Sequence, residues 1–249
     1  MDSRIINMKE HLKRILHYKG SIIEQWRIKK QHDKIFDKKS RTLKQHGNYM
    51  LDAVFEVANN FGIQAWIEFG TLLGALRENA FIKHDFDLDI GMYKKDYSLE
   101  FENALYEKGF IKIRSFYIYS VDKKSETMTE VTFDYEGLQL DIFFNQEETN
   151  CRSAYYYESY DKVNSEKHIY SVVKLKYPYV KGLSMLTINK KEYPSPQNAK
   201  EILEAYYGKD YMTPIKDYII PDDDPCTEKL SFDKYHGLMK GVWNLSKSK

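Results

Sequence analysis

The sequence predicts a mixed α/β (α+β) fold, in which helices flank a short mixed β-sheet. Stretches with apolar residues three and four positions apart indicate amphipathic helices near both ends of the chain. In the middle, polar and apolar residues alternate, which indicates strands. The 249 residues are 42% hydrophobic and 30% charged. Such a chain can bury one sizeable core.

Composition excludes several classes of protein. The 38 Lys+Arg and 37 Asp+Glu residues leave a formal charge of +1, so we expect no nucleic-acid polymer as partner. No apolar run approaches the roughly 18 to 20 residues of a membrane span, and the N-terminus has no apolar signal core. The two cysteines, Cys151 and Cys226, cannot form a disulfide framework. We therefore expect a cytoplasmic protein.

Residues 1–46 form a basic segment, with thirteen Lys or Arg against five Asp or Glu. Ile5, Leu12, Ile15 and Trp26 recur at helical spacing, which predicts an amphipathic helix. One interpretation is a helix docked on the domain with a solvated basic face. The other is a basic face that rests on an anionic membrane, at its inner surface, or that holds an anionic substrate. Both interpretations stay open.

The first half of the remaining chain alternates helices with short strands. Asn59, Asn60 and Gly62 end a predicted helix, and Thr71 is a plausible N-cap for another. The expected elements are a helix over 43–60, a strand over 65–69, a helix over 72–78, a strand over 85–90 and a helix over 97–108.

The second half is predicted to be mostly extended. Glu136-Gly137 marks a hairpin inside a β-rich stretch over 110–145, and the Tyr-rich stretch over 151–192 also reads as extended. Helices are expected over 197–207 and 229–245. These elements divide the chain into the basic helical segment 1–46, a main domain 47–215, and a C-terminal loop and helix, 216–249, packed on that domain.

The stretch Asp85-Phe-Asp-Leu-Asp89 carries the clearest chemical signal. On a strand, Asp85, Asp87 and Asp89 project from one face about 6 to 7 Å apart. Three such carboxylates repel one another unless a cation lies among them, and hard oxygen ligands suit Mg²⁺ or Mn²⁺. A calcium loop needs Gly where Ile90 stands. A glycosyltransferase with a D-x-D metal site is a second alternative.

Two further features favour phosphoryl transfer. Gly70-Thr71 lies at a predicted strand-to-helix turn, where exposed backbone N–H groups bind phosphate, and Arg77 follows two turns later. Asp141 is an isolated acid in the apolar strand Leu138-Gln-Leu-Asp-Ile-Phe-Phe144. A phosphate-binding turn, paired carboxylates and a third carboxylate on a later strand are the parts of a two-metal phosphoryl-transfer site.

These motifs resemble a known family. Gly70-Thr-Leu-Leu-Gly-Ala-Leu-Arg77, then Phe81-Ile82 and Asp85-Phe-Asp-Leu-Asp-Ile-Gly91, is similar to the signature of the LicD/fukutin family in the nucleotidyltransferase superfamily. Leu140-Asp-Ile-Phe143 resembles its third-carboxylate strand, and Tyr206-Tyr-Gly-Lys-Asp-Tyr211 resembles its C-terminal segment. The resemblance covers roughly residues 60–215. It implies a nucleotidyltransferase-type mixed sheet in a catalytic domain, with helical additions at both ends.

The resemblance also implies a LicD-type phosphotransferase of polysaccharide biosynthesis, such as capsule or lipopolysaccharide modification. Members move phosphocholine or an alditol phosphate from a CDP-linked donor, such as CDP-choline or CDP-ribitol, to a hydroxyl of a glycan or lipid-linked glycan, and CMP leaves. Asp87, Asp89 and Asp141 would hold Mg²⁺ or Mn²⁺, with Asp141 as alternative base and Asp85 as alternative ligand. Gly70, Thr71 and Arg77 would hold donor phosphates.

Two other functions stay open. The first is true nucleotidyl transfer, in which NMP joins a small acceptor and pyrophosphate leaves. The second is a partner-binding scaffold without catalysis. Intact acids at Asp85, Asp87, Asp89 and Asp141 argue against a scaffold, because it has no reason to hold clustered charge.

Overall fold

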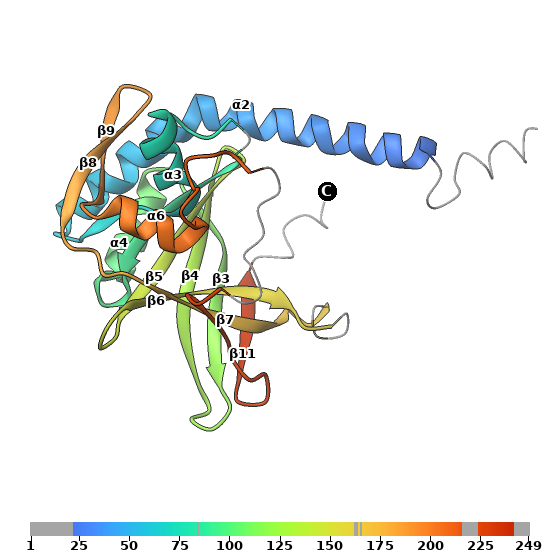
Figure 1. Ribbon diagram of the computed structural model, residues 1–249, viewed down its shortest axis with the longest axis vertical. Helices are drawn as coiled ribbons and strands as arrows, with labels where there is room; N and C mark the ends of the chain where they lie inside the picture. Colours follow the sequence, from blue (N-terminus) through green and yellow to red (C-terminus); the bar gives the residue numbers. More distant parts are fainter. Residues whose placement is uncertain (1–21, 84, 162–163, 165, 216–223, 242–249) are drawn as a thin grey trace, which may run out of the picture.

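A long helix leads into the sheet. The computed structural model describes residues 22–83, 85–161, 164, 166–215 and 224–241. Helix α2 (Ile22–Asn60) is continuous over 39 residues, and its N-terminal part extends beyond the rest of the domain (Figure 1). The helix predicted over 43–60 is therefore the C-terminal part of α2, and the boundary proposed between residues 46 and 47 falls inside it. The helix predicted around Ile5 and Leu12 lies outside the described residues.

The next elements bring the sequence motif together. Strand β1 (Ala65–Ile67) is followed by α3 (Phe69–Glu78) and β2 (Asp87–Tyr93). The prediction that Thr71 caps a helix starting at residue 72 is wrong, because α3 begins at Phe69. The Thr71 hydroxyl instead accepts a hydrogen bond from the backbone N–H of Asp89, 2.9 Å away. This bond ties the first turn of α3 to β2.

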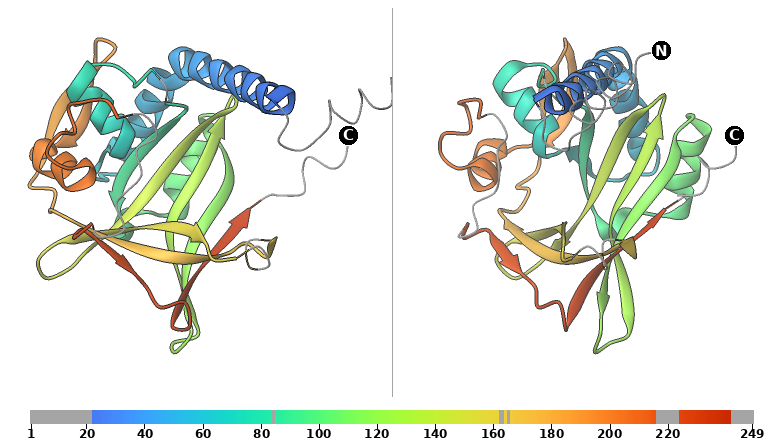
Figure 2. Two further views of the ribbon diagram at one scale, coloured as in Figure 1. Left: turned by 45° about the vertical axis from the view of Figure 1, so that its right-hand side comes forward. Right: turned by 90° about the vertical axis from the view of Figure 1, so that its right-hand side faces the viewer.

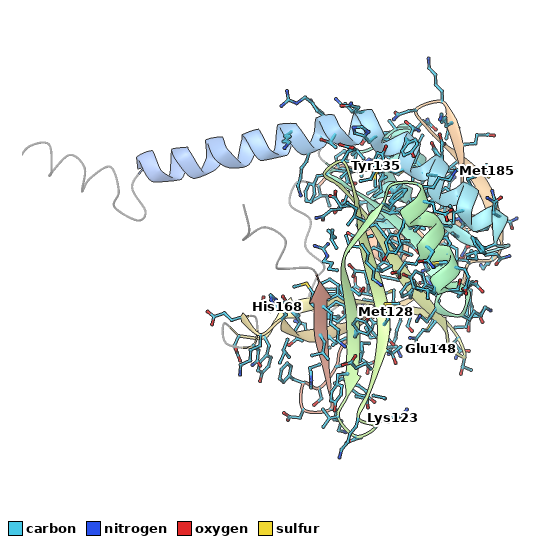
Figure 3. All side chains as sticks on the ribbon, turned by 180° about the vertical axis from the view of Figure 1, so that it is seen from behind. Lys123, Met128, Tyr135, Glu148, His168 and Met185 are labelled. Carbon is cyan, nitrogen blue, oxygen red and sulfur yellow. The ribbon has the colours of Figure 1, made fainter. Side chains whose placement is uncertain are left out.

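Three strand pairings, two antiparallel and one parallel, form the sheet that carries the motif. Strands β3 (Ile111–Ser120), β4 (Ser125–Tyr135) and β5 (Leu138–Glu147) pair antiparallel in turn, and β2 lies parallel to β5. The predicted hairpin at Glu136-Gly137 is confirmed, with φ values of 53° and 82°. This left-handed conformation is the one that a tight hairpin turn requires. Figure 3 shows Tyr135 at this end, beside α2, and Lys123 at the far tip of the β3–β4 hairpin.

The later strands close the sheet on itself. The predicted extended region contains β6 (Arg152–Ser159) and β7 (Ile169–Tyr177), and β6 pairs with both β5 and β7. The pairing β3–β4–β5–β6–β7 is completed by β11 (Tyr235–Gly241), which joins β7 to β3. These strands therefore form a barrel-like sheet, whose lower strands cross beneath the helices in both views of Figure 2. The short strand β10 (Thr227–Lys229) lies at the edge beside β7.

The prediction of a helix over 229–245 is wrong within the described residues. Strands β10 and β11 occupy Thr227–Lys229 and Tyr235–Gly241 instead. Two glycines, Gly237 and Gly241, weaken a helix here, and the backbone groups of β11 pair with β3 along its whole length. Tertiary pairing therefore decides the structure of this segment.

Small elements complete the domain. They are the single-turn 3-10 helix η1 (Lys94–Asp96), α4 (Leu99–Glu107), the hairpin of β8 (Leu183–Ile188) with β9 (Lys191–Pro196), and α6 (Ala199–Tyr207). No helix that the structure describes has both the length and the apolar character needed to cross a membrane.

Alternation along the strands separates a core face from a polar face. Leu88, Leu140 and Phe133 are wholly buried, and the Phe133 ring contacts Tyr106 of α4. The neighbouring residues Asp87, Asp89, Asp141 and Thr132 project to the opposite face. The apolar face buries the core, so the acids are held on rigid strands rather than on loops.

Helix α4 carries a buried carboxylate, that of Glu102, which is held by hydrogen bonds. Glu102 is 8% exposed and receives hydrogen bonds from Tyr97 and Tyr106 and, at 2.9 Å, from Lys112. Burial acts to raise the pKa of Glu102, but these hydrogen bonds outweigh it and lower the pKa. The ionised form is therefore favoured in the folded protein.

We expect Glu102→Gln to lower the free energy of unfolding at pH 7 by about 1.5–3 kcal/mol, the contribution of hydrogen bonds to a charged group. Because folding lowers the pKa, this contribution is present above the unfolded pKa and is lost as pH falls through the folded value. Urea unfolding at pH 7 and at pH 3 measures the difference, which should shrink at pH 3. The exposed Glu107→Gln is the control. An equal difference at both pH values would contradict the prediction.

Candidate active site

A single row of side chains crosses four strands on the polar face. Arg114 of β3 lies opposite Thr132 of β4, Thr132 lies opposite Asp141 of β5, and Asp141 lies opposite Asp89 of β2. The Thr132 hydroxyl donates a hydrogen bond to Asp141, and Arg114 Nη2 lies 3.5 Å from Asp141 Oδ1. The strand register thus brings together two of the acids that the sequence predicts, 52 positions apart.

The start of α3 lies next to Asp89, at the end of this row. The backbone N–H of Gly70 donates to Asp89 Oδ2 at 3.0 Å. A Cβ atom at Gly70 would lie 2.7 Å from Asp85 Oδ2 and 3.3 Å from Asp89 Oδ2, so only glycine lets both carboxylates approach this turn. Asp85 itself precedes β2, but its carboxylate joins those of Asp87 and Asp89.

The acids raise one another's pKa values. Burial, followed by the neighbouring Asp85, raises the pKa of Asp87 to about 7. Burial and the carboxylates of Asp87, Asp85 and Asp141 raise the pKa of Asp89 well above its ordinary value. Burial also raises the pKa of Asp141 to about 6, although Thr132 and Arg114 act to lower it. Protons or a cation must balance these charges.

The structure adds three residues that sequence reasoning missed. Glu130 of β4 is 7% exposed, and burial and Asp141 raise its pKa to about 8. Lys39 of α2 and Arg114 of β3 both act to lower the pKa of Asp87. A signal for Glu130 existed, since Glu130, Thr132 and Asp134 alternate with Val131, Phe133 and Tyr135 as the acids do around Asp87.

The predicted phosphate-binding groups have other partners here. Thr71 is 2% exposed and its hydroxyl faces the backbone of Asp89. Arg77 donates from Nε and Nη2 to Glu78 Oε1, at 3.1 and 2.8 Å. Arg77 lies seven residues after Gly70, about 10 Å along the axis of α3. Whether Gly70, Thr71 or Arg77 holds a phosphate stays a prediction.

A wholly buried ion pair includes Glu68, two residues before Gly70. Glu68 and Arg152 are both 0% exposed, with Arg152 Nη1 at 2.9 Å and Nη2 at 3.2 Å from the two Glu68 oxygens. Trp66 Nε1, at 2.7 Å, and the Tyr206 hydroxyl also donate to Glu68. Arg152 further donates to Asn145 and to the Pro178 carbonyl oxygen. The network joins β1, β5, β6 and α6.

Phe69 connects this network to the site. Its backbone has φ 38°, a left-handed conformation that is uncommon for a bulky residue. Its ring stacks on Tyr206 at 4.8 Å and meets Phe143 edge-on at 4.7 Å. Packing therefore holds Phe69 in a strained conformation, which directs the next N–H, that of Gly70, to Asp89.

The donor chemistry of the site fits a hard divalent cation. Asp85, Asp87, Asp89 and Asp141 supply carboxylate oxygens, which Mg²⁺ and Mn²⁺ prefer, and burial raises the pKa of each of them. Among the described residues, no three Asp, Glu, His or Cys side chains already stand in metal-binding geometry. Binding would thus require their carboxylates to rotate toward the ion.

A small cavity lies away from the acids. It measures about 200 Å³ and is lined by Tyr93, Lys94, Lys95, Asn145, Gln146 and Glu147. These residues lie at the carboxyl ends of the parallel strands β2 and β5 and in η1 directly after β2, whereas Asp87 begins β2. The cavity is therefore separate from the candidate site.

The fold and the site define a mixed α/β protein with clustered carboxylates on one face of its sheet. Residues 62–198 match the family model described as the LicD/FKTN/FKRP nucleotidyltransferase domain. The chain belongs to the LicD/FKTN/FKRP family, and the resemblance seen in its motifs is confirmed. The matched range contains Gly70, the three clustered aspartates and Asp141.

Individual relatives are distant. Ribitol-5-phosphate transferase FKTN of Macaca fascicularis is 27% identical over 170 residues, and the human protein of the same name is 26% identical over 170 residues. Each match covers 67% of this chain but 33% of the relative, so the chain spans about a third of the length of these relatives. A protein of Rickettsia typhi is 33% identical over 97 residues, 36% of this chain and 30% of its own.

Proposed function

We propose that the chain is a metal-dependent phosphotransferase of glycan modification. It would move a phospho-substituent, phosphocholine or an alditol phosphate, from a CDP-linked donor to a hydroxyl of a glycan or lipid-linked glycan. The observation that carries the proposal is the row of Asp89 and Asp141 on adjacent parallel strands, with Asp87 beside it. Family membership and the similarity to ribitol-5-phosphate transferases support the same class.

The proposed chemistry is an in-line displacement at phosphorus. The acceptor hydroxyl oxygen forms the new bond to phosphorus while the bond from phosphorus to the CMP oxygen breaks, and CMP keeps that electron pair. Asp141 would take the hydroxyl proton, and its hydrogen bonds with Thr132 and Arg114 support this role because they orient its carboxylate. Asp87 and Asp89 would hold Mg²⁺ or Mn²⁺, with Asp85 beside them. When bound, that ion would neutralise charge on the donor phosphates.

The proposal extends to the fold. Strands β1, β2, β5 and β4, with α2 and α4 behind their apolar face and α3 at the turn, would be the nucleotidyltransferase-type core. The strands β6, β7 and β11 would then be additions that close the barrel-like part of the sheet. The N-terminal part of α2 would be an addition to this core, and Lys39 of the same helix would contribute to the site.

Thermal unfolding with Mg²⁺ and a panel of nucleotides tests the proposed donor class. The panel holds CMP, CDP, CDP-choline, CDP-ribitol, CDP-glycerol, UDP-sugars and ATP. A ligand at a hundred times its Kd adds about 2.7 kcal/mol, which should raise the midpoint by several degrees. We expect a Mg²⁺-dependent shift with cytidine nucleotides, greatest for the true donor. EDTA and Asp89→Asn should each remove it.

Other outcomes identify the alternatives. A shift with UDP-sugars alone would favour a D-x-D glycosyltransferase, and a shift with ATP alone would favour nucleotidyl transfer. With a donor and acceptor in hand, label in the cytosine base separates the two reactions. The label stays with CMP in the proposed reaction and joins the acceptor in nucleotidyl transfer.

A further inference from the structure

Two cationic side chains from distant parts of the chain reach the carboxylates. Lys39 comes from α2 and Arg114 from β3, 75 positions later. Lys39 Nζ lies 4.4 Å from the centre of the Phe86 ring, between Asp85 and Asp87 in sequence. Arg114 lies at the end of the row that contains Asp141. Lys39 and Arg114 both act to lower the pKa of Asp87, so each lies within electrostatic reach of that carboxylate.

The polar groups at the start of α3 are already committed to the protein. The Gly70 N–H donates to Asp89, and the Thr71 hydroxyl, 2% exposed, accepts from the Asp89 backbone. Both groups hold Asp89 in place. The negative charge of a phosphate placed beside these acids must be met by other side chains.

Arg114 has the geometry for this role. Its Nε donates to Thr132 Oγ1 at 3.0 Å and its Nη2 faces Asp141, so one edge of the guanidinium is fixed by the sheet. Nη1 has no hydrogen-bond partner among the described residues, and the side chain is 28% exposed. A guanidinium held along one edge and open along the other suits planar recognition of phosphate oxygens.

Lys39 is held nearby by the backbone of α2. The Ser40 hydroxyl donates to the Lys83 carbonyl oxygen at 3.1 Å, which fixes this part of α2 beside the loop before β2. Lys39 is half-buried and forms no ion pair with a described residue. Its ammonium thus acts on the Asp87 carboxylate without an ion pair to a described residue.

We propose that Lys39 and Arg114 together form the phosphate-binding site of the chain, with the diphosphate of a nucleotide as the ligand class. This inference rests on the proposed function and names the residues that bind its donor. A diphosphate brings negative oxygens next to the carboxylates, and nearby cationic side chains reduce the repulsion that a metal ion leaves. Lys39 would bind one phosphate as a point charge, and Arg114 would bind the other through two N–H groups.

Isothermal titration with Mn²⁺ and either inorganic pyrophosphate or CDP tests the inference. The variants are Lys39→Gln, Arg114→Gln and Arg114→Lys, with the exposed neighbour Lys38→Gln as matched control. We expect Lys39→Gln and Arg114→Gln each to weaken pyrophosphate binding by at least about tenfold, and Arg114→Lys to recover part of the loss. Lys38→Gln should stay within about twofold. In Lys39→Gln and Arg114→Gln, the affinity for Mn²⁺ alone should stay the same or increase, because each variant removes a positive charge that repels the ion.

Several results would overturn the inference. Variants with a lower thermal midpoint but unchanged pyrophosphate affinity would show that the two cations only neutralise the acids. If Arg77→Gln strongly weakened pyrophosphate binding and Arg114→Gln did not, the phosphate-binding site would lie at α3 instead. If the unaltered chain binds pyrophosphate through these residues but not CDP, the inference holds and the cytidine donor is wrong. If it binds neither, both fail.

Discussion

Replacing Arg152 by methionine is expected to lower the free energy of unfolding by about 3–5 kcal/mol, because it leaves the Glu68 carboxylate buried without its partner. Both side chains are 0% exposed, so water cannot take over the lost interaction. Urea unfolding at pH 7 measures the change. The matched control is Lys181→Met, which breaks the exposed pair with Glu201 and should cost no more than about 1 kcal/mol.

A second variant separates charge from packing. Glu68→Gln combined with Arg152→Met leaves no buried charge, so it should recover part of the stability lost in Arg152→Met alone. If Arg152→Met costs no more than Lys181→Met, or if the double variant is no more stable than Arg152→Met, the assigned role of the pair is incorrect. Either result would mean that water or another group stabilises Glu68.

The same pair sets the geometry of the site. Gly91 leaves room for it, since a Cβ there would lie 2.3 Å from Trp66 Nε1 and 2.5 Å from Glu68 Oε2. Glu68 directly precedes Phe69 and Gly70, whose N–H binds Asp89. Stability and active-site geometry are thus coupled through one buried network, so a variant of Arg152 should affect both.

The chemical core of the site could be predicted from the sequence because it follows local patterns. Asp85, Asp87 and Asp89 alternate with apolar residues, which predicts a strand with acids on one face. Asp141 stands out as one acid in an apolar run. The register that places Asp141 opposite Asp89 is not local, because it depends on parallel pairing across more than forty intervening residues.

What the sequence did not predict depends on tertiary contacts. The sequence places Lys39 in the basic segment 1–46 and gives no contact for its side chain, and only the continuous course of α2 brings it to Phe86. Arg152 lies in a Tyr-rich strand with nothing nearby that shows its partner, Glu68, 84 positions earlier. The sequence predicts a helix in the C-terminal segment, where the structure has β11. Strand β11 depends on pairing with β3 and β7, and the local sequence carries no sign of that pairing.

Asp87→Asn is expected to stabilise the metal-free protein while abolishing its proposed activity. The pKa of Asp87 is raised from 3.8 to about 7 by burial and by Asp85, so the folded state binds a proton more tightly than the unfolded state. Stability from this group is therefore lost as pH rises between these two values. Asparagine carries no such charge. The advantage of the variant should thus appear above about pH 4, grow toward pH 7 and stay constant beyond it.

The measurement is the difference in unfolding free energy between the variant and the unaltered chain, from urea titrations at pH 5, 6, 7 and 8 with EDTA. Using the difference cancels the titration of all other acids to first order. Asp122→Asn, an exposed carboxylate at the tip of the β3–β4 hairpin, is the control and should change stability by less than about 0.5 kcal/mol at each pH. A variant whose advantage shrinks as pH rises would contradict the assigned direction of the shift.

Metal ions should reverse the order of stability. A divalent cation that binds the folded chain through Asp87 stabilises it by mass action, and asparagine, which has no charge, binds such a cation much more weakly. At pH 8 with excess Mg²⁺ the unaltered chain should therefore gain stability that Asp87→Asn does not gain. Weaker binding of the cation in Asp87→Asn should also reduce the rate of phosphoryl transfer by at least about a thousandfold, because the ion stabilises the transition state by several kcal/mol. A variant that is more stable without metal and inactive with it would mean that Asp87 is kept for binding a cation, at a cost in stability.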